Sequence, residues 1–162
     1  MNLPFGKIEM NYREATIHDI QQIQYVRNIV KENRLSDPAL VADKDVQDFI
    51  TRRGRGWICE IDGIIIGFSI VDMIEKNVWA LFIDPKHESK GIGKTLHGMM
   101  LDWYFNQTKE TIWLSTARGT RAERFYHIAG WNEAGTHGEE VKFIMTYNQY
   151  RLMKGKGKAH RH

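Results

Sequence analysis

The chain has 162 residues, of which 42% are hydrophobic and 27% charged, a composition typical of one globular domain and not of a disordered chain. Its single cysteine, Cys59, excludes an internal disulfide. The longest apolar stretch, residues 64–71, is too short to span a bilayer, which takes about 20 apolar residues. The N-terminus has no continuous apolar segment, so we expect a cytoplasmic protein that does not bind membranes.

The net charge of +3 comes from 23 Lys and Arg against 20 Asp and Glu. The last twelve residues hold five of the basic residues and no acidic one, which leaves 18 basic against 20 acidic residues before them. The body therefore lacks the basic excess of a dedicated nucleic-acid binder, and we expect no nucleic-acid partner. Lys and Gly alternate at the C-terminus, so residues 151–162 are predicted to be a disordered tail after a folded domain of residues 1–150.

The first elements are predicted as a strand followed by two helices. Residues 9–15 form the strand, and Thr16 with Asp19 three positions later forms a variant of the capping box that begins a helix. Apolar residues at helical spacing continue this helix to about residue 30. A loop over residues 32–42 leads to a second, short helix over residues 43–53.

Three consecutive strands are predicted next. Residues 57–61 and 64–72 form a hairpin around Asp62-Gly63, because this pair tolerates the positive φ angles of a tight turn. Residues 78–83 form the third strand, which ends at Asp84-Pro85.

The second half alternates helices and strands. A long helix follows a glycine-containing loop, and the later elements are a strand over 111–116, a helix over 121–129, and strands over 131–134 and 141–147. Antiparallel hairpins followed by a βαβ unit predict an α/β fold with a mixed, mostly antiparallel sheet flanked by helices.

The glycine loop over residues 88–96 lies between a strand and an amphipathic helix. The start of such a helix presents backbone N–H groups and the positive end of the helix dipole. Gly91 and Gly93 would let an anion come close to that backbone. The physical expectation is a bound phosphate or pyrophosphate.

Two well-known phosphate-binding patterns fit this loop poorly. A dinucleotide fingerprint needs a third glycine where the chain has Leu96. A P-loop would end well at Gly93-Lys94-Thr95, but its first glycine falls on Glu88.

A third pattern fits better. The segment Glu88 to Gly93 resembles, at both glycines, the pyrophosphate loop [RQ]-x-x-G-x-G of the GNAT superfamily of acetyl-CoA-dependent N-acetyltransferases. Residues 81–85 resemble that family's Leu-x-[Val/Ile]-x-Pro strand end. Residues 122–131 resemble its A-x-x-F-Y-x-x-x-G-[FW] segment, in the correct order along the chain. The resemblance extends from Tyr12 to Tyr147.

The resemblance implies the GNAT fold and direct transfer of an acetyl group from acetyl-CoA to a primary amine of a small molecule or a protein. It implies that Tyr126 protonates the leaving thiolate and that the backbone N–H of Phe82 or Ile83 binds the oxyanion. A core tyrosine with a satisfied hydroxyl is the alternative for Tyr126. The coenzyme-binding residues implied are Phe82, Ile83, Ser89, Lys90, Gly91, Ile92, Gly93, Lys94, Thr116, Phe125 and Tyr126.

A general base is harder to assign. Glu75 lies where relatives often carry a carboxylate, and Asp72 ends the preceding strand. Either could deprotonate the amine, directly or through water, and either could be a solvated turn residue. Ser115 and Thr116 could contact pantetheine or the substrate.

Two positions depart from the family pattern. Glu88 stands where the family has Arg or Gln, so we expect its carboxylate to face solvent, while Lys90, Lys94 and the backbone hold the anion. Gly119 stands where the family often has Asn, which removes one side-chain contact to the coenzyme. The histidines show no metal-ligand spacing, and we expect no metal.

Two other functions remain open at this stage. A catalytically inactive acyl-CoA sensor would keep the loop without the chemistry, and a nucleotide-binding protein of P-loop type would bind ATP and not CoA. The family resemblance is also compatible with a homodimer. The acceptor amine is not specified by any of these patterns.

Overall fold

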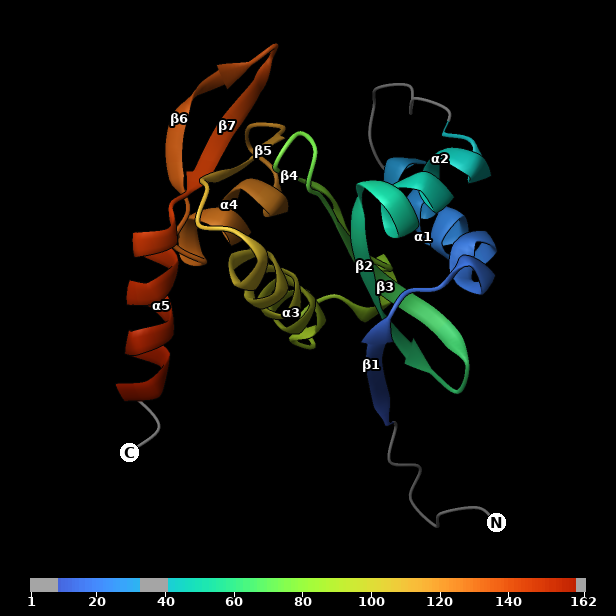
Figure 1. Ribbon diagram of the computed structural model, residues 1–162. Helices are drawn as coiled ribbons and strands as arrows, with labels where there is room; N and C mark the ends of the chain where they lie inside the picture. Colours follow the sequence, from blue (N-terminus) through green and yellow to red (C-terminus); the bar gives the residue numbers. More distant parts are fainter. Residues whose placement is uncertain (1–8, 33–40, 160–162) are drawn as a thin grey trace. The chain divides into compact units, whose positions relative to one another are not determined.

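The computed structural model describes residues 9–32 and 41–159 (Figure 1). It divides into two compact units, one of Met1–Ile74 with Trp79–Met100 and one of Glu75–Val78 with Leu101–His162. The strands are β1 (Met10–Glu14), β2 (Gly54–Ile61), β3 (Ile64–Asp72), β4 (Asn77–Ile83), β5 (Ile112–Thr116), β6 (Asn132–His137) and β7 (Glu140–Met145). The α-helices are α1 (Ile20–Glu32), α2 (Asp43–Asp48), α3 (Ile92–Gln107), α4 (Arg121–Ile128) and α5 (Tyr147–Ala159).

The strands form one mixed seven-stranded sheet with the hydrogen-bonded order β1-β2-β3-β4-β5-β7-β6. In the first unit, β1 and β2 pair antiparallel, as do β2 and β3. The predicted turn joins β2 to β3, with φ angles of 51° at Asp62 and 78° at Gly63. Only four residues connect β3 to β4, and a connection that short can join only antiparallel neighbours. The predicted α/β class with a mixed, mostly antiparallel sheet is confirmed.

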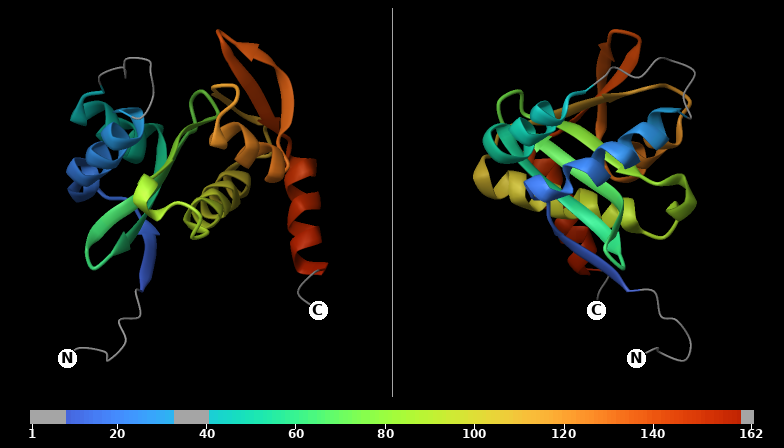
Figure 2. Two further views of the ribbon diagram at one scale, coloured as in Figure 1. Left: turned by 180° about the vertical axis from the view of Figure 1, so that it is seen from behind. Right: turned by 90° about the vertical axis from the view of Figure 1, so that its right-hand side faces the viewer.

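The core of the first unit lies between β3 and the helices α1 and α2, and Figure 2 shows α1 across one face of the strands. A bulge in the β2–β3 ladder pairs Cys59 with Gly67 and Glu60 with Ile65. The extra residue places Ile65 on the same face as Phe68, although the two are three positions apart. The core residues are Ala15, Ile20, Ile23, Val26, Val46, Ile50, Ile58, Ile65, Phe68, Ile70 and Ala80.

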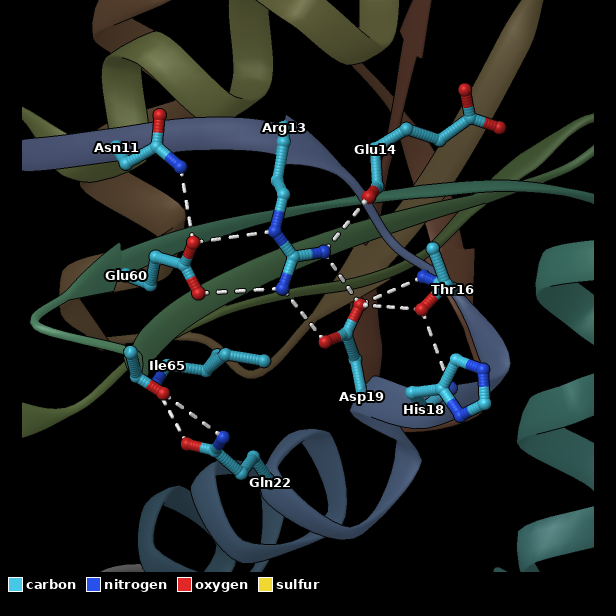
Figure 3. Close-up of polar contacts among 10 residues, drawn as sticks. Asn11, Arg13, Glu14, Thr16, His18, Asp19, Gln22, Glu60 and Ile65 are labelled. Carbon is cyan, nitrogen blue, oxygen red and sulfur yellow. Dashed lines mark hydrogen bonds and ion pairs between the residues drawn. The ribbon is translucent and has the colours of Figure 1, made fainter.

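Arg13 links β1, β2 and the start of the first helix (Figure 3). Its guanidinium donates two hydrogen bonds of 2.8 Å to Asp19, whose side chain is 7% exposed, and longer ones of 3.3 Å to Glu60. Asp19 also accepts from the backbone N–H of Thr16 at 2.7 Å, which completes the predicted capping box. The hydrogen bonds from Arg13 lower the pKa of Asp19 and of Glu60.

This network predicts a loss of stability in acid. The pKa of Asp19 is lower in the folded chain than in the unfolded chain. The stabilisation that ionised Asp19 gives to the fold is therefore complete above its unfolded pKa of about 4, and it is lost as the pH falls through its folded pKa. Asp19→Asn should lower the free energy of unfolding at pH 7 by about 2 kcal/mol and flatten its pH dependence below pH 5. Urea unfolding followed between pH 3 and pH 7 measures both effects. Asp48→Asn, which removes an exposed pair with Arg52, is the control and should change little. An unchanged acid slope in Asp19→Asn would contradict the role given to this network.

In the second unit, β5, β7 and β6 form an antiparallel ladder. The beginning of β4 joins it, since Asn77 pairs in parallel with Trp113 of β5. The Trp113 backbone N–H donates to the Lys76 carbonyl and its indole N–H to the Glu75 carbonyl, both at 3.1 Å. Glu75 and Lys76 are thereby held against β5 within the second unit.

The C-terminal segment differs from the expectation. Residues 151–159 continue the helix α5 and are not a disordered tail; residues 160–162 lie outside the described residues. Tyr150 and Lys154 of α5 both hydrogen-bond the carboxylate of Asp102 on α3, at 2.5 and 3.0 Å. These contacts to a distant part of the sequence stabilise a helix that its two glycines would weaken.

Other expectations differ only at element ends. The second predicted helix changes to a π-helical turn over Phe49–Arg53 after α2 ends at Asp48. The predicted strand over 131–134 runs instead over Asn132–His137. The loop predicted over 32–42 falls largely outside the described residues. Among the described helices, none has the length and apolar character that crossing a membrane would need.

Candidate functional site

The glycine loop before α3 has two residues in the left-handed region. Ser89 has a φ of 67° and Gly91 a φ of 79°. A non-glycine residue rarely adopts this conformation, so the fold around the loop must hold the Ser89 backbone in it. Glu88 is exposed, in agreement with its expected orientation toward solvent, and so is Lys94.

The first turn of α3 is held against the sheet of its own unit at Gly67. A Cβ on Gly67 would lie 2.8 Å from Ile83 at the end of β4 and 3.3 Å from both Ile92 and Leu96 of α3. Glycine in the middle of β3 thus allows the helix to pack close to the strands. The carbonyl of Leu96 also accepts a hydrogen bond from Ser69 at 3.4 Å.

The start of α3 is suited to bind an anion. The Thr95 N–H donates to the Gly91 carbonyl at 3.1 Å. The N–H groups of residues 92–94 come before it, and because no helical turn precedes them, they have no carbonyl of the same helix to bond. Apart from Gly91 and its two chain neighbours, no described residue has a heavy atom within 4 Å of the position that a Cβ on Gly91 would occupy. Together with the helix dipole, this geometry lets a phosphate approach the backbone closely.

Lys90 is the basic side chain of the loop with a defined contact. Its ammonium group lies 3.1 Å from Nδ1 of His87, which accepts the hydrogen bond when the imidazole is neutral. Lys90 precedes the first residue of α3 by two positions, so its positive charge would add to the attraction of this loop for a phosphate.

Phe82 and Ile83, the predicted oxyanion donors, end β4 in the first unit. Both are half-buried, and the Phe82 ring packs edge-on against Phe68 with 5.6 Å between centroids. Their side chains therefore belong to the packing of the unit. Any catalytic contribution comes from the backbone, and the oxyanion role stays a prediction.

Tyr126 lies on α4 in the second unit and is 6% exposed. Its ring packs against Phe125, Trp131 and Phe143, with centroid distances of 5.2, 5.6 and 6.1 Å. Burial raises the pKa of the phenol above its usual value near 10. The hydroxyl is thus protonated at neutral pH, which is the form that a proton donor needs, although a higher pKa makes it a weaker acid.

The two carboxylates considered as general base have different surroundings. Asp72 is 2% exposed and accepts hydrogen bonds from Arg53 at 2.6 Å and from the Ile74 N–H at 2.9 Å. It is a structural partner of Arg53 and not a solvated turn residue. Glu75 is exposed in the turn before β4 and stays the candidate base.

The remaining predicted residues lie in the second unit. Ser115 donates to Glu140 at 2.9 Å, and Thr116 is 5% exposed on β5. The backbone N–H of Gly119 donates to Glu123 at 2.9 Å, and a side chain at Gly119 would meet open space. The loss of the family's Asn at this position therefore leaves no packing defect.

One group of side chains was not recognised from the sequence. Glu123 and His127 of α4 come together with Glu133 of β6. The histidine spacing does not reveal this group, because two of its members are carboxylates. The signal that could have found it is a Glu and a His four residues apart on one helix face.

Residues 16–131 match the acetyltransferase (GNAT) family. The chain therefore belongs to the GNAT acetyltransferase family, which confirms the family expected from the glycine loop and the segment around Tyr126. A comparison with curated proteins finds no match.

Solved structures share the fold. The PaiA N-acetyltransferase from Thermoplasma acidophilum, solved with coenzyme A, has a TM-score of 0.76 at 18% identity, covering 86% of this chain and 100% of its own. The ribosomal-protein-S18-alanine N-acetyltransferase from Escherichia coli has a TM-score of 0.65 at 18% identity, covering 85% and 92%. The putative acetyltransferase yncA from Salmonella typhimurium, solved with acetyl-CoA, has a TM-score of 0.69 at 16% identity, covering 85% and 94%.

Proposed function

We propose that the protein transfers an acetyl group from acetyl-CoA to a primary amine of a small molecule or a protein. The observation that carries this proposal is the backbone at the start of α3, where Ser89 and Gly91 have positive φ and Gly91 is open to a ligand. A pyrophosphate bound there would be held by the N–H groups of residues 90–94 and by Lys90 and Lys94.

The chemistry is a direct attack. The neutral amine nitrogen adds to the thioester carbonyl, and a backbone N–H of Phe82 or Ile83 stabilises the oxyanion that forms. The carbon–sulfur bond then breaks, the amide carbonyl re-forms, and the CoA sulfur leaves as a thiolate that takes a proton from Tyr126. The excess proton of the amine passes to Glu75, directly or through water.

The solved relatives support the choice of cosubstrate and acceptor class. Two of the structures named above hold coenzyme A or acetyl-CoA, and a third relative is named for acetylation of an alanine of a ribosomal protein. These structures support the reaction class. They leave the particular acceptor open, because all three share less than 25% identity with this chain.

The direct test is release of free CoA from acetyl-CoA in the presence of amines. A panel of polyamines, amino acids, aminoglycosides and peptides with free N-termini is incubated with the protein, and thiol formation is followed optically. We expect release that depends on the amine for at least one class of acceptor. Calorimetric binding of acetyl-CoA without turnover on any amine would instead indicate an acyl-CoA sensor. ATP binding without CoA binding would contradict the proposal altogether.

A further inference from the structure

Three potential metal ligands meet at the junction of α4 and β6 within the second unit. The ligand atoms of Glu123, His127 and Glu133 all lie within 4.8 Å of one another. Nε2 of His127 is 3.1 Å from a carboxylate oxygen of Glu133. Glu123 and His127 are four residues apart, so they project from the same face of α4.

One of these distances matches what a tetrahedral Zn²⁺ ion requires, and Glu123 would have to move closer to complete the site. With Zn–N and Zn–O bonds of about 2.0–2.2 Å, neighbouring ligand atoms of a tetrahedral site are about 3.3 Å apart. The His127–Glu133 distance already satisfies this condition. Because the three ligand atoms all lie within 4.8 Å of one another, Glu123 needs a shift of at most about 1.5 Å, which its flexible side chain can supply by rotation. A single imidazole with two carboxylates suits zinc better than Ca²⁺ or Mg²⁺, which prefer oxygen ligands alone.

The ligands are already oriented by the surrounding protein. The His127 ring packs edge-on against Phe143 with a centroid distance of 4.9 Å, and Phe143 is the β7 residue that pairs with Glu133. The Gly119 N–H donates to a carboxylate oxygen of Glu123 at 2.9 Å. Contacts of this kind around a metal site fix ligand geometry and raise affinity.

The charge at this position also favours a dication. Two carboxylates lie close together, and the guanidinium of Arg118, 3.8 Å from Glu123, is a partly exposed and weak partner. A divalent cation would neutralise both carboxylates at once. All three ligands fall within eleven consecutive residues. A metal ion that joins them would close only a short loop, so the loss of conformational entropy on closing it is small.

We propose that Glu123, His127 and Glu133 bind one Zn²⁺ ion, with a water molecule as the fourth ligand. The ion would connect the end of α4 to β6 and so stabilise the segment that carries Tyr126 and Trp131. It takes no part in acetyl transfer, and the proposal holds whether or not the proposed function is correct.

The test is binding of zinc to the full chain after removal of metals with a chelator. His160→Gln and His162→Gln are introduced first in every sample, because these two C-terminal histidines offer a second way to bind zinc. Calorimetry should then show one Zn²⁺ per chain, and differential scanning fluorimetry should show a rise in the melting temperature. Co²⁺ in place of Zn²⁺ should give the intense visible absorption of a tetrahedral site.

Variants assign the ligands. Groups around a metal site already contribute about 10–100-fold to affinity, so His127→Gln or Glu133→Gln should weaken zinc binding by at least that factor and abolish the Co²⁺ spectrum. Neither should lower the melting temperature of the metal-free chain by more than a few degrees, since both side chains are exposed. His137→Gln, on the exposed end of β6, is the matched control and should bind zinc normally. Equal zinc affinity in His127→Gln and the parent chain, or no binding to either, would overturn the proposal.

Discussion

Tyr126→Phe should leave acetyl-CoA binding intact and lower kcat by about 10²-fold. The substitution keeps the ring that packs against Trp131 and Phe143 and removes only the hydroxyl. General acid catalysis typically contributes about 10²–10⁴-fold, and a CoA thiolate is a moderate leaving group, so the lower end of that range is expected. Single-turnover measurements under conditions where chemistry limits the rate are the appropriate readout.

Tyr104→Phe is the matched control for this experiment. Its hydroxyl is completely buried and, within the described residues, has no hydrogen-bond partner. Removing it should leave kcat unchanged and should not lower stability, because an unsatisfied buried hydroxyl is unfavourable. A loss of rate in Tyr126→Phe that appears only in KM would show that the hydroxyl aids binding. Near-normal kcat would show that another group or water donates the proton.

The pH dependence gives a second test of Tyr126. The rate should rise with pH as the acceptor amine loses its proton. Burial raises the pKa of Tyr126, so the phenol keeps its proton up to and beyond its usual value of about 10. Ionisation of Tyr126 therefore causes no fall in rate below about pH 10. A wild-type alkaline decline near pH 8 that Tyr126→Phe abolishes would contradict this assignment.

Gly91→Val should weaken binding of acetyl-CoA by at least about tenfold, which corresponds to about 1.4 kcal/mol. Valine at a φ of 79° is strained, and its side chain would fill the open space where the phosphate has to approach the backbone. Calorimetric titration with CoA on a chain shown to be folded by circular dichroism measures the effect.

Gly63→Val separates strain from ligand exclusion. Gly63 has a φ of 78° and open space at the Cβ position, as Gly91 does, but it lies in the turn between β2 and β3. Both variants should lose about 1–2 kcal/mol of stability from the strained backbone. Only Gly91→Val should also lose CoA affinity. Equal CoA affinity in the two variants would show that the start of α3 does not hold the coenzyme.

The sequence correctly predicted those elements that are formed by residues close together in the chain. The Asp62-Gly63 turn is such a case, because the positive φ angles it needs are tolerated by these two residues themselves. The capping box of Thr16 and Asp19 is another, since both partners lie within one turn. The glycine loop before α3 combines a strand end, two glycines and a helix start within about ten residues, so the strand–loop–helix order and a glycine with positive φ could also be anticipated.

Long-range contacts decided what the local signals could not. The Lys-Gly alternation at the C-terminus predicted disorder, but Asp102 on α3 pairs with Tyr150 and Lys154 and the segment is helical. The sequence left Asp72 open as a general base, whereas its burial beside Arg53 assigns it to structure. In both cases the deciding partner is a residue that sequence spacing does not place nearby.

The sequence alone determined the α/β class, the order of the elements as far as β7 and the family, because hydrophobic periodicity, turn residues and two ordered motifs are all read along the chain. Only the tertiary structure decided that Gly67 brings α3 against β3 and that the bulge places Ile65 with Phe68. It alone placed Glu123 and His127 beside Glu133. The physical reason is that periodicity specifies which face of an element is buried, whereas the partner of that face depends on packing of the whole unit.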